Sequence, residues 1–169
     1  MAQRTFSRCL CVAFLALFFA AVSRGQESPH PAVRNVADMQ FGQVPGMPTC
    51  STGAVQSGDP TKGSSVILAR MGAGCVIPWH WHTPTETLML VSGEGRAEAK
   101  DGKPAILLAG GFAQMPSRHV HQFTCVKECM LYVSSDAAFD MHYVTGAGKE
   151  IPPAEALKAV GETAAIPHP

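Results

Sequence analysis

Short apolar runs alternate with turn residues from about residue 52 to residue 144. After GAVQ, the runs are SSVILARM, VIPWHW, ETLMLVS, RAEA, AILLA, FAQMP, HQFTC, MLYVS and FDMHYV. The breaks between them include TPT, SGEG, KDGK, AGG, SRH, KE and DA. Many short strands with Gly-containing turns are typical of an antiparallel sandwich or a small barrel. KDGK at 100–103 also indicates a hairpin with a two-residue Asp-Gly turn.

The two flanks of this region have a different pattern. IPPAEALKAVG, residues 151–161, is the one predicted helix: Pro152 can begin it and Gly161 ends it. The sequence therefore predicts an all-β domain at 51–145, followed by a C-terminal helix and tail at 146–169. Residues 26–50 are rich in Pro and Gly and predict an extended arm. Part of the arm is expected to dock through its apolar residues, Met39, Phe41, Val44 and Met47.

The first 25 residues form a separate segment. MAQRTFSR carries two arginines and no acid, CLCVAFLALFFAAV is an apolar run, and small residues follow. This order predicts a secretory signal peptide at 1–25, cleaved after Ser23 or Gly25, in an exported protein that is periplasmic or secreted. An uncleaved N-terminal anchor is the alternative, although the apolar run is short for a membrane span.

Cleavage would leave 10 Lys and Arg against 13 Asp and Glu, a formal net charge of −3. This charge favours neither nucleic acid nor an anionic membrane surface as a partner. It would also leave four cysteines, which an exported protein can join in disulfides: Cys50, Cys75, Cys125 and Cys129. Cys125 and Cys129 flank VKE, an expected hairpin turn across which they could meet. Four buried free thiols are the alternative, and four cysteines allow three pairings.

The stretch VIPWHWHTPTE combines histidines with tryptophans. His80 and His82 are two residues apart, so in a strand both face one side, with Trp79 and Trp81 on the other. The tryptophans are expected to pack against the arm or a partner subunit. Glu86 follows a short turn, so a hairpin can return its carboxylate to the two imidazoles.

Two further histidines occur in PSRHVHQF. His121, together with His80, His82 and Glu86, supplies the three imidazoles and one carboxylate of a shell for a divalent transition metal. Such a shell leaves two positions of an octahedral ion open. His119 has the same parity as His121, but it lies in the turn after Pro116 and is expected to be a surface or supporting residue.

The first of these motifs resembles that of the cupin superfamily. The order Gly74, five residues, His80, one, His82, three, Glu86, six, Gly93 matches the family's first motif without departure. The second motif resembles the family's less closely: Gly110, Pro116 and His121 match. Two positions of the second motif depart, with Arg118 in place of a turn glycine and Cys125 in place of an asparagine.

The resemblance implies a single cupin jelly-roll β-barrel that holds one metal ion on His80, His82, Glu86 and His121. The expected ion is Fe, Mn, Ni, Cu or Zn, and Cys125 as a thiolate is a possible extra ligand. The expected function is a dioxygenase- or lyase-like enzyme for a small molecule, and the expected assembly is a homodimer. The alternative is a metal-dependent binding or sensor protein without turnover.

The surrounding residues suggest the walls of a pocket. Leu88 and Leu90 share the face of Glu86, and with Met115 and Phe123 they are candidates for an apolar pocket wall. Further candidates are Gln114, for a hydrogen bond to a bound ligand, and His142 and Tyr143, either of which could transfer protons.

Overall fold

The computed structural model describes residues 32–160 of the chain. The predicted signal peptide at 1–25, the start of the arm at 26–31 and the tail at 161–169 lie outside the described residues. Within 32–160, no helix has the length and apolar character needed to cross a membrane. Residues 34–160 belong to one compact unit.

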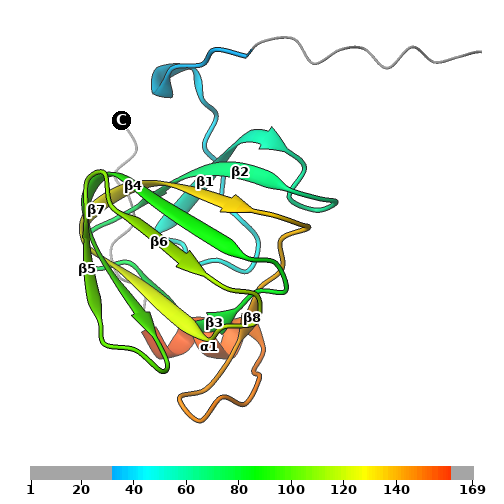
Figure 1. Cartoon of the computed structure of the whole chain (residues 1–169), viewed down its shortest axis with the longest axis vertical. Helices are drawn as coiled ribbons and strands as arrows, with labels where there is room; N and C mark the ends of the chain where they lie inside the picture. Colours follow the sequence, from blue (N-terminus) through cyan, green and yellow to red (C-terminus); the bar gives the residue numbers. More distant parts are fainter. Residues whose placement is uncertain (1–31, 161–169) are drawn as a thin grey trace, which may run out of the picture. The chain divides into compact units, whose positions relative to one another are not determined.

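The described part of the chain is mostly β structure, as the sequence predicts (Figure 1). The single α-helix begins and ends within the range predicted for it. The elements in order are η1 (Val36–Asp38), β1 (Ser51–Gly58), β2 (Ser65–Met71), β3 (Val76–Trp81), β4 (Glu86–Ala99), β5 (Ala105–Leu108), β6 (Phe112–Met115), β7 (His121–Ser135), β8 (His142–Tyr143) and α1 (Pro153–Val160).

The strands form two layers that share β4 and β7. In the first layer, the first half of β4 pairs with the last residues of β7. On one side β6 pairs with β4, and on the other side β2 pairs with β7 and β1 pairs with β2. The last part of β4 pairs with the start of β7, and this layer extends to β5, β3 and β8. All pairings are antiparallel, and among the described strands the sheet does not close. This arrangement is a jelly-roll-like sandwich.

Both shared strands bend where the sequence pattern predicts a break. SGEG and KE were expected to be turns between separate strands, but they lie inside β4 and β7, which are continuous. The pairing register shifts between Leu90 and Gly95. At the bend Gly93 has φ +89°, and a Cβ on it would lie 2.0 Å from the main-chain oxygen of Glu128. Glycine is therefore required there both for its backbone angle and for the close approach.

The hairpin after β4 is wider than predicted. Its last paired residues are Ala97 and Ala105, so the loop is longer than a two-residue Asp-Gly turn. The Asp-Gly sequence locates the reversal correctly, but the strands separate before they reach it.

The four cysteines form two disulfides, Cys50–Cys75 and Cys125–Cys129. The alternative of free thiols is therefore wrong, and Cys125 has no thiolate to offer a metal. Cys125 and Cys129 meet across the bend of one strand, not across a hairpin turn. Their Cα atoms are 5.7 Å apart, whereas four residues of straight strand would span about 13 Å.

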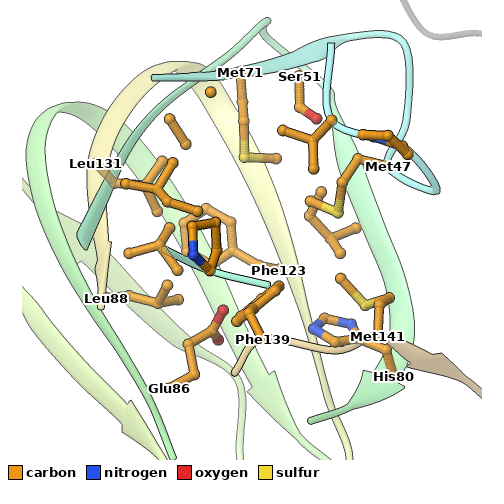
Figure 2. Close-up of a pocket in the computed structure, with 18 of the residues that line it drawn as sticks. Met47, Ser51, Met71, His80, Glu86, Leu88, Phe123, Leu131, Phe139 and Met141 are labelled. Carbon is orange, nitrogen blue, oxygen red and sulfur yellow. The ribbon is translucent and has the colours of Figure 1, made fainter. Parts of the chain in front are cut away.

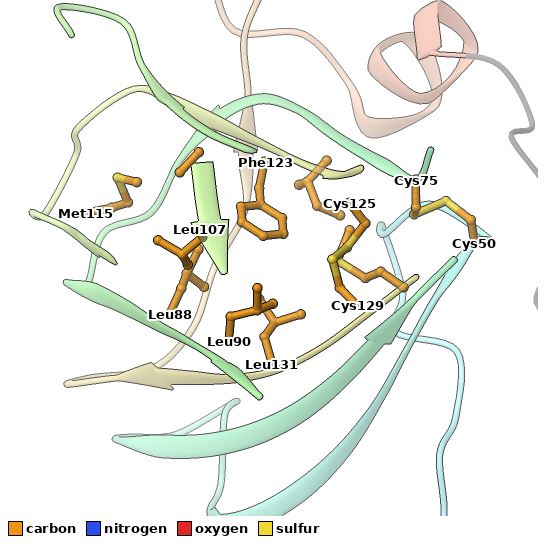
Figure 3. Packing of buried hydrophobic residues seen from close by; sticks show 13 residues of the cluster. Cys50, Cys75, Leu88, Leu90, Leu107, Met115, Phe123, Cys125, Cys129 and Leu131 are labelled. Atoms are coloured by element: carbon orange, nitrogen blue, oxygen red, sulfur yellow. A yellow bond between two sulfur atoms is a disulfide. The ribbon is translucent and has the colours of Figure 1, made fainter. Parts of the chain in front are cut away.

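The hydrophobic core lies between the two layers (Figure 3). It contains Leu88, Leu90, Leu107, Phe123 and Leu131, together with both disulfides. The core is closely packed at the bend of β4: a Cβ on Gly95 would lie 2.3 Å from the Phe123 ring.

The described part of the arm docks on the sheet, as its apolar residues predict. Gly42 and Gly53 exchange two main-chain hydrogen bonds of 2.9 and 3.0 Å. The guanidinium of Arg70 lies 3.9 Å from the centre of the Phe41 ring, and Met47 packs against the core.

Candidate metal centre

Three strands bring His80, His82, Glu86 and His121 together. The two histidines of β3 share a face, and the turn at 83–85 returns Glu86 beside them as the first residue of β4. His121 is the first residue of β7 and pairs with His80. One ligand atom of each side chain lies within 4.8 Å of those of the other three, and all four residues are buried. The structure thus assembles the four residues that the two sequence motifs single out.

The three imidazoles are held in the same manner. Each Nδ1 lies against a main-chain carbonyl oxygen, which can only accept a hydrogen bond. Each Nδ1 therefore carries the proton, and in the neutral ring Nε2 presents its lone pair to the cluster. The bonds run from His80 to Pro78 at 2.6 Å, from His82 to Asp140 at 2.5 Å and from His121 to His119 at 2.8 Å.

The cluster has the donors that a metal requires. His82 Nε2 is buried and has no hydrogen-bond partner among the described residues; the nearest carboxylate oxygen, of Glu86, is 3.5 Å away. His121 Nε2 lies 3.2 Å from the other oxygen of Glu86. The Nε2 lone pairs of His82 and His121 face the Glu86 carboxylate, and such an arrangement is stable only with a positive charge between the nitrogen and the carboxylate. Ligands on opposite sides of a transition metal are about 4.2 Å apart, comparable with the span of this cluster.

Burial and mutual charge set the protonation of these groups. Burial, followed by the charges of His121 and His82, holds the pKa of His80 well below its usual value of 6.5. Burial also acts to lower the pKa of His82, but the Glu86 carboxylate outweighs it and the pKa is raised on balance. Burial alone would raise the pKa of Glu86, yet His121 and His82 lower it strongly. The carboxylate is therefore ionised at neutral pH.

A cavity of about 520 Å³ opens at the cluster (Figure 2). His80, Glu86 and His121 form part of its wall, whereas most of the other lining side chains are apolar. They come from the arm, from both sheet layers and from the segment between β7 and β8, and include Met47, Met71, Leu88, Phe123, Leu131 and Phe139.

The predicted pocket wall is correct for two of its four residues. Leu88 and Phe123 line the cavity, while Leu90 and Met115 are buried in the core away from it. Gln114 was a candidate to hydrogen-bond a bound ligand, but it is exposed and does not line the cavity. It alternates with the buried Met115 along β6, so its side chain belongs to the outer face.

Neither candidate proton-transfer residue lines the cavity. Tyr143 is buried and donates its hydroxyl hydrogen bond to the carbonyl of Gly46 at 2.9 Å; burial raises its pKa to about 12. His142 lies on the outer face and stacks on Trp81, with ring centres 3.8 Å apart. Trp81 thus packs within its own chain, and α1 contacts β3 and β8 (Figure 1). The contact of the tryptophans with a partner subunit stays a prediction.

The segment 136–141 is the part of the site that the sequence does not reveal. FDMHYV predicts a strand, but only His142–Tyr143 pairs as β8. The preceding residues bend over the centre: the Phe139 ring lies 4.4 Å from the His82 ring, and the Asp140 carbonyl accepts from His82. The Asp140 carboxylate accepts the main-chain N–H of Thr83 at 2.7 Å. An Asp that binds a backbone 57 residues away leaves no local sequence pattern.

Arg118, which stands in place of the family's turn glycine, adopts the backbone conformation that the turn requires. Arg118 has φ +60°, the left-handed conformation that a glycine would adopt there. Its N–H donates to the carbonyl of His82 at 2.8 Å, and its guanidinium lies 5.1 Å from the centre of the Trp81 ring. The turn of the second motif therefore supports the first. His119 contributes its carbonyl, and its side chain is not part of the cluster.

The family model described as the cupin domain matches residues 67–134, which contain all four clustered residues. Residues 67–134 are a cupin domain. A comparison with curated protein sequences finds no match.

Solved structures agree on the cupin fold. One similar structure is an RmlC-like cupin from Shewanella frigidimarina, with a TM-score of 0.54 and 16% identity over 66% of this chain and 92% of the other. A second is the polyketide cyclase RemF from Streptomyces resistomycificus, with a TM-score of 0.60 and 14% identity over 69% and 87%. A third is KdgF from Halomonas sp., with a TM-score of 0.54 and 14% identity over 64% and 94%. At these identities the likeness concerns the fold alone.

Proposed function

We propose that this cupin is an exported, mononuclear metal-dependent enzyme, dioxygenase- or lyase-like, that acts on a small molecule. One observation carries the proposal: four buried donors converge at the wall of an apolar cavity, and three of them, His80, Glu86 and His121, face it. Such a position brings a ligand in the cavity to the centre.

The residues of the chain have separable parts in this proposal. A bound divalent metal would supply Lewis-acid or redox chemistry at a substrate oxygen. His80, His82, Glu86 and His121 would hold it, leaving two positions of a six-coordinate ion for substrate or a second reactant. The main-chain carbonyls keep each Nε2 aimed at the centre. The apolar walls exclude water, which strengthens electrostatic interactions inside the cavity.

A metal-dependent binding protein without turnover is the second candidate. It is favoured by the scarcity of free polar side chains around the cavity. Gln43 and Ser51 both donate to the carbonyl of Pro48, and the Asp140 carboxylate accepts from Thr83. Proton transfer would therefore depend on the centre itself, since Gln43 and Ser51 do not ionise near neutral pH and both Asp140 oxygens are engaged, by Thr83 and His142.

Metal content tests the centre. Residues 26–169 are purified and analysed for bound elements in the wild type and in His82→Ala, Glu86→Ala and His119→Ala. We expect about one ion per wild-type chain and a large loss in the first two variants, because each removes a ligand. His119→Ala is the matched control, since it removes a neighbouring imidazole but keeps the carbonyl that holds His121. Equal metal content in all four proteins would refute the assignment.

Turnover distinguishes the enzyme from the binding protein. Oxygen uptake is measured with a panel of diphenols and diketones, and product formation without oxygen is followed for lyase activity. Activity that disappears in Glu86→Ala but survives in His119→Ala supports the enzyme. Tight binding of panel members without any product supports the second candidate.

Export and assembly are proposed on separate grounds. The two disulfides support export, since such bonds persist in oxidising compartments. Sequencing the N-terminus of the protein released from cells that express the full chain tests this, with a start at Arg24 or Gln26 expected. A homodimer stays a prediction, which light scattering of the purified protein tests.

A further inference from the structure

We infer that the cavity selects an uncharged, apolar ligand that has a single oxygen-bearing end, and that it rejects ligands with a charge at the other end. The ligand class is a catechol, enol or diketone head with an alkyl or aryl remainder. The orientation rests on the proposed function, because the head is assigned to the side of His80 and Glu86. The apolar selection rests on the cavity walls alone.

The charges around the cavity are confined to one side. Its titratable lining residues are His80, Glu86, His121 and Asp140, and among the described residues neither Lys nor Arg lines it. Figure 2 shows Glu86 and His80 at one end of the cavity and Met71 and Ser51 at the other. A carboxylate, phosphate or sulfate at that second end would lose its hydration and find no cation there.

Hydroxyl-rich ligands are also poorly matched. The polar side chains that line the cavity away from the centre already use their donors within the protein. Gln43 Nε2 and Ser51 Oγ donate to the carbonyl of Pro48 at 3.1 and 3.0 Å. Thr61 Oγ1 donates to Asp59 at 2.7 Å. A sugar in this cavity would find none of these side-chain donors free, and most of its hydroxyls would face methyl and thioether groups in place of water, so it would bind weakly.

The shape of the cavity suits an apolar remainder of variable length. Its volume of about 520 Å³ lies within the usual range of small-ligand sites. Met47 from the arm and Met71 from β2 lie toward the end remote from Glu86 (Figure 2). Unbranched thioether side chains adjust to different occupants. Each methylene group buried there is expected to raise affinity by about fourfold.

The test uses matched ligands and equilibrium binding under argon, so that oxygen-dependent turnover cannot interfere. Calorimetry compares a series of 4-alkylcatechols from ethyl to hexyl, and then a pair that differs only in charge. The pair is 4-(3-methylbutyl)catechol and 3-(3,4-dihydroxyphenyl)propionate, which have the same shape and the same metal-binding head. We expect affinity to rise along the series and the neutral member of the pair to bind at least tenfold more tightly. Equal binding, or tighter binding of the carboxylate, would overturn the inference.

A charge reversal at the remote end sharpens the test. Met47→Lys places an ammonium on a half-buried arm residue, and we expect it to reduce the preference for the neutral ligand by about tenfold or more. Met47→Leu is the control and should keep the preference. An unchanged preference in Met47→Lys would show that ligands do not reach this end, against the inference.

His82→Ala separates this inference from the proposed function, since His82 is outside the cavity lining. Suppose that the wild type holds no metal, but that the wild type and His82→Ala both bind longer alkylcatechols more tightly. The apolar selection then stands and the metal function fails. If the wild type holds metal but binds the carboxylate equally well, the metal function stands and this inference fails.

Discussion

Asp140 links a candidate metal ligand to the main chain around it, and its removal is expected to weaken metal binding without removing any ligand. Its carbonyl accepts the Nδ1–H of His82, while its carboxylate accepts the N–H of Thr83 at 2.7 Å. The carboxylate therefore fixes the position of the carbonyl that orients the imidazole. Asp140→Ala removes the carboxylate and keeps the carbonyl, so any loss of metal affinity comes from a shift of the main chain or from the loss of the Asp140 charge near His82.

The expected size of this effect follows from the exposure of the side chain. A hydrogen bond to an ionised group contributes about 1.5–3 kcal/mol when shielded from water. The Asp140 side chain is 39% exposed, so screening reduces this contribution to about 1 kcal/mol. That corresponds to about fivefold in metal affinity. This fivefold loss is smaller than the 10- to 100-fold usually seen for residues that support a ligand, because the carbonyl itself remains.

A competition titration against a chromophoric chelator measures this affinity directly. Asp140→Asn retains an oxygen that can accept the Thr83 N–H, so it should restore most of the affinity lost in Asp140→Ala. The absorption spectrum of the Co(II)-loaded protein should shift in Asp140→Ala and return toward the wild type in Asp140→Asn. Wild-type affinity in Asp140→Ala, or equal impairment in both variants, would refute the reasoning.

Three other predictions follow from single features of the structure. In urea, the free energy of unfolding of Arg118→Gly should exceed that of Arg118→Ala by about 0.5–1 kcal/mol. Both variants lose the contact with Trp81, but only alanine keeps the backbone strain of φ +60°. Metal affinity should fall as the pH is lowered from 8 to 5, and the fall should begin above pH 6.5. The pKa of His82 is raised above 6.5, so a proton competes with the metal for this imidazole from a higher pH. Competition titration measures the affinity, and an affinity that does not depend on pH would contradict this reasoning. Replacing Cys50 and Cys75 with alanine should lower the free energy of unfolding by about 3 kcal/mol in urea, since the disulfide closes a loop with a separation of 25 residues; an unchanged midpoint would show that the bond adds no stability.

The clustering of His80, His82 and Glu86 could be predicted from sequence because these residues follow local rules. His80 and His82 share a face through the two-residue period of a strand, and Glu86 follows one short turn. His121 is remote in sequence, and only the resemblance of its motif to that of the cupins connects it to the others. Arg118 shows the same limit, since only the glycine that it replaces in the family's motif hints at the positive φ, and arginine itself does not.

The parts that escaped prediction depend on distant contacts. Gly93 reads as a turn residue, yet β4 continues through it because β7 bends alongside and keeps the pairing. Four cysteines leave three pairings open, and the choice of Cys50–Cys75 is made by the docking of the arm. Asp140 and Met141 reach the site from a segment whose apolar pattern predicts a longer strand. In each case the deciding partner lies far away in the chain.

The use of main-chain carbonyls to hold the imidazoles has a consequence for how this protein can change by mutation. The acceptors at Pro78, His119 and Asp140 are present whatever side chain occupies these positions, so a substitution there can shift an acceptor but cannot delete it. For Pro78 and His119, which each lie two residues from the histidine they hold, an insertion or deletion between acceptor and histidine would displace the carbonyl altogether. The centre is thus buffered against drift in residue identity and vulnerable to changes in chain length. Substitutions can therefore diversify the cavity walls while the segments 78–80 and 119–121 keep their lengths.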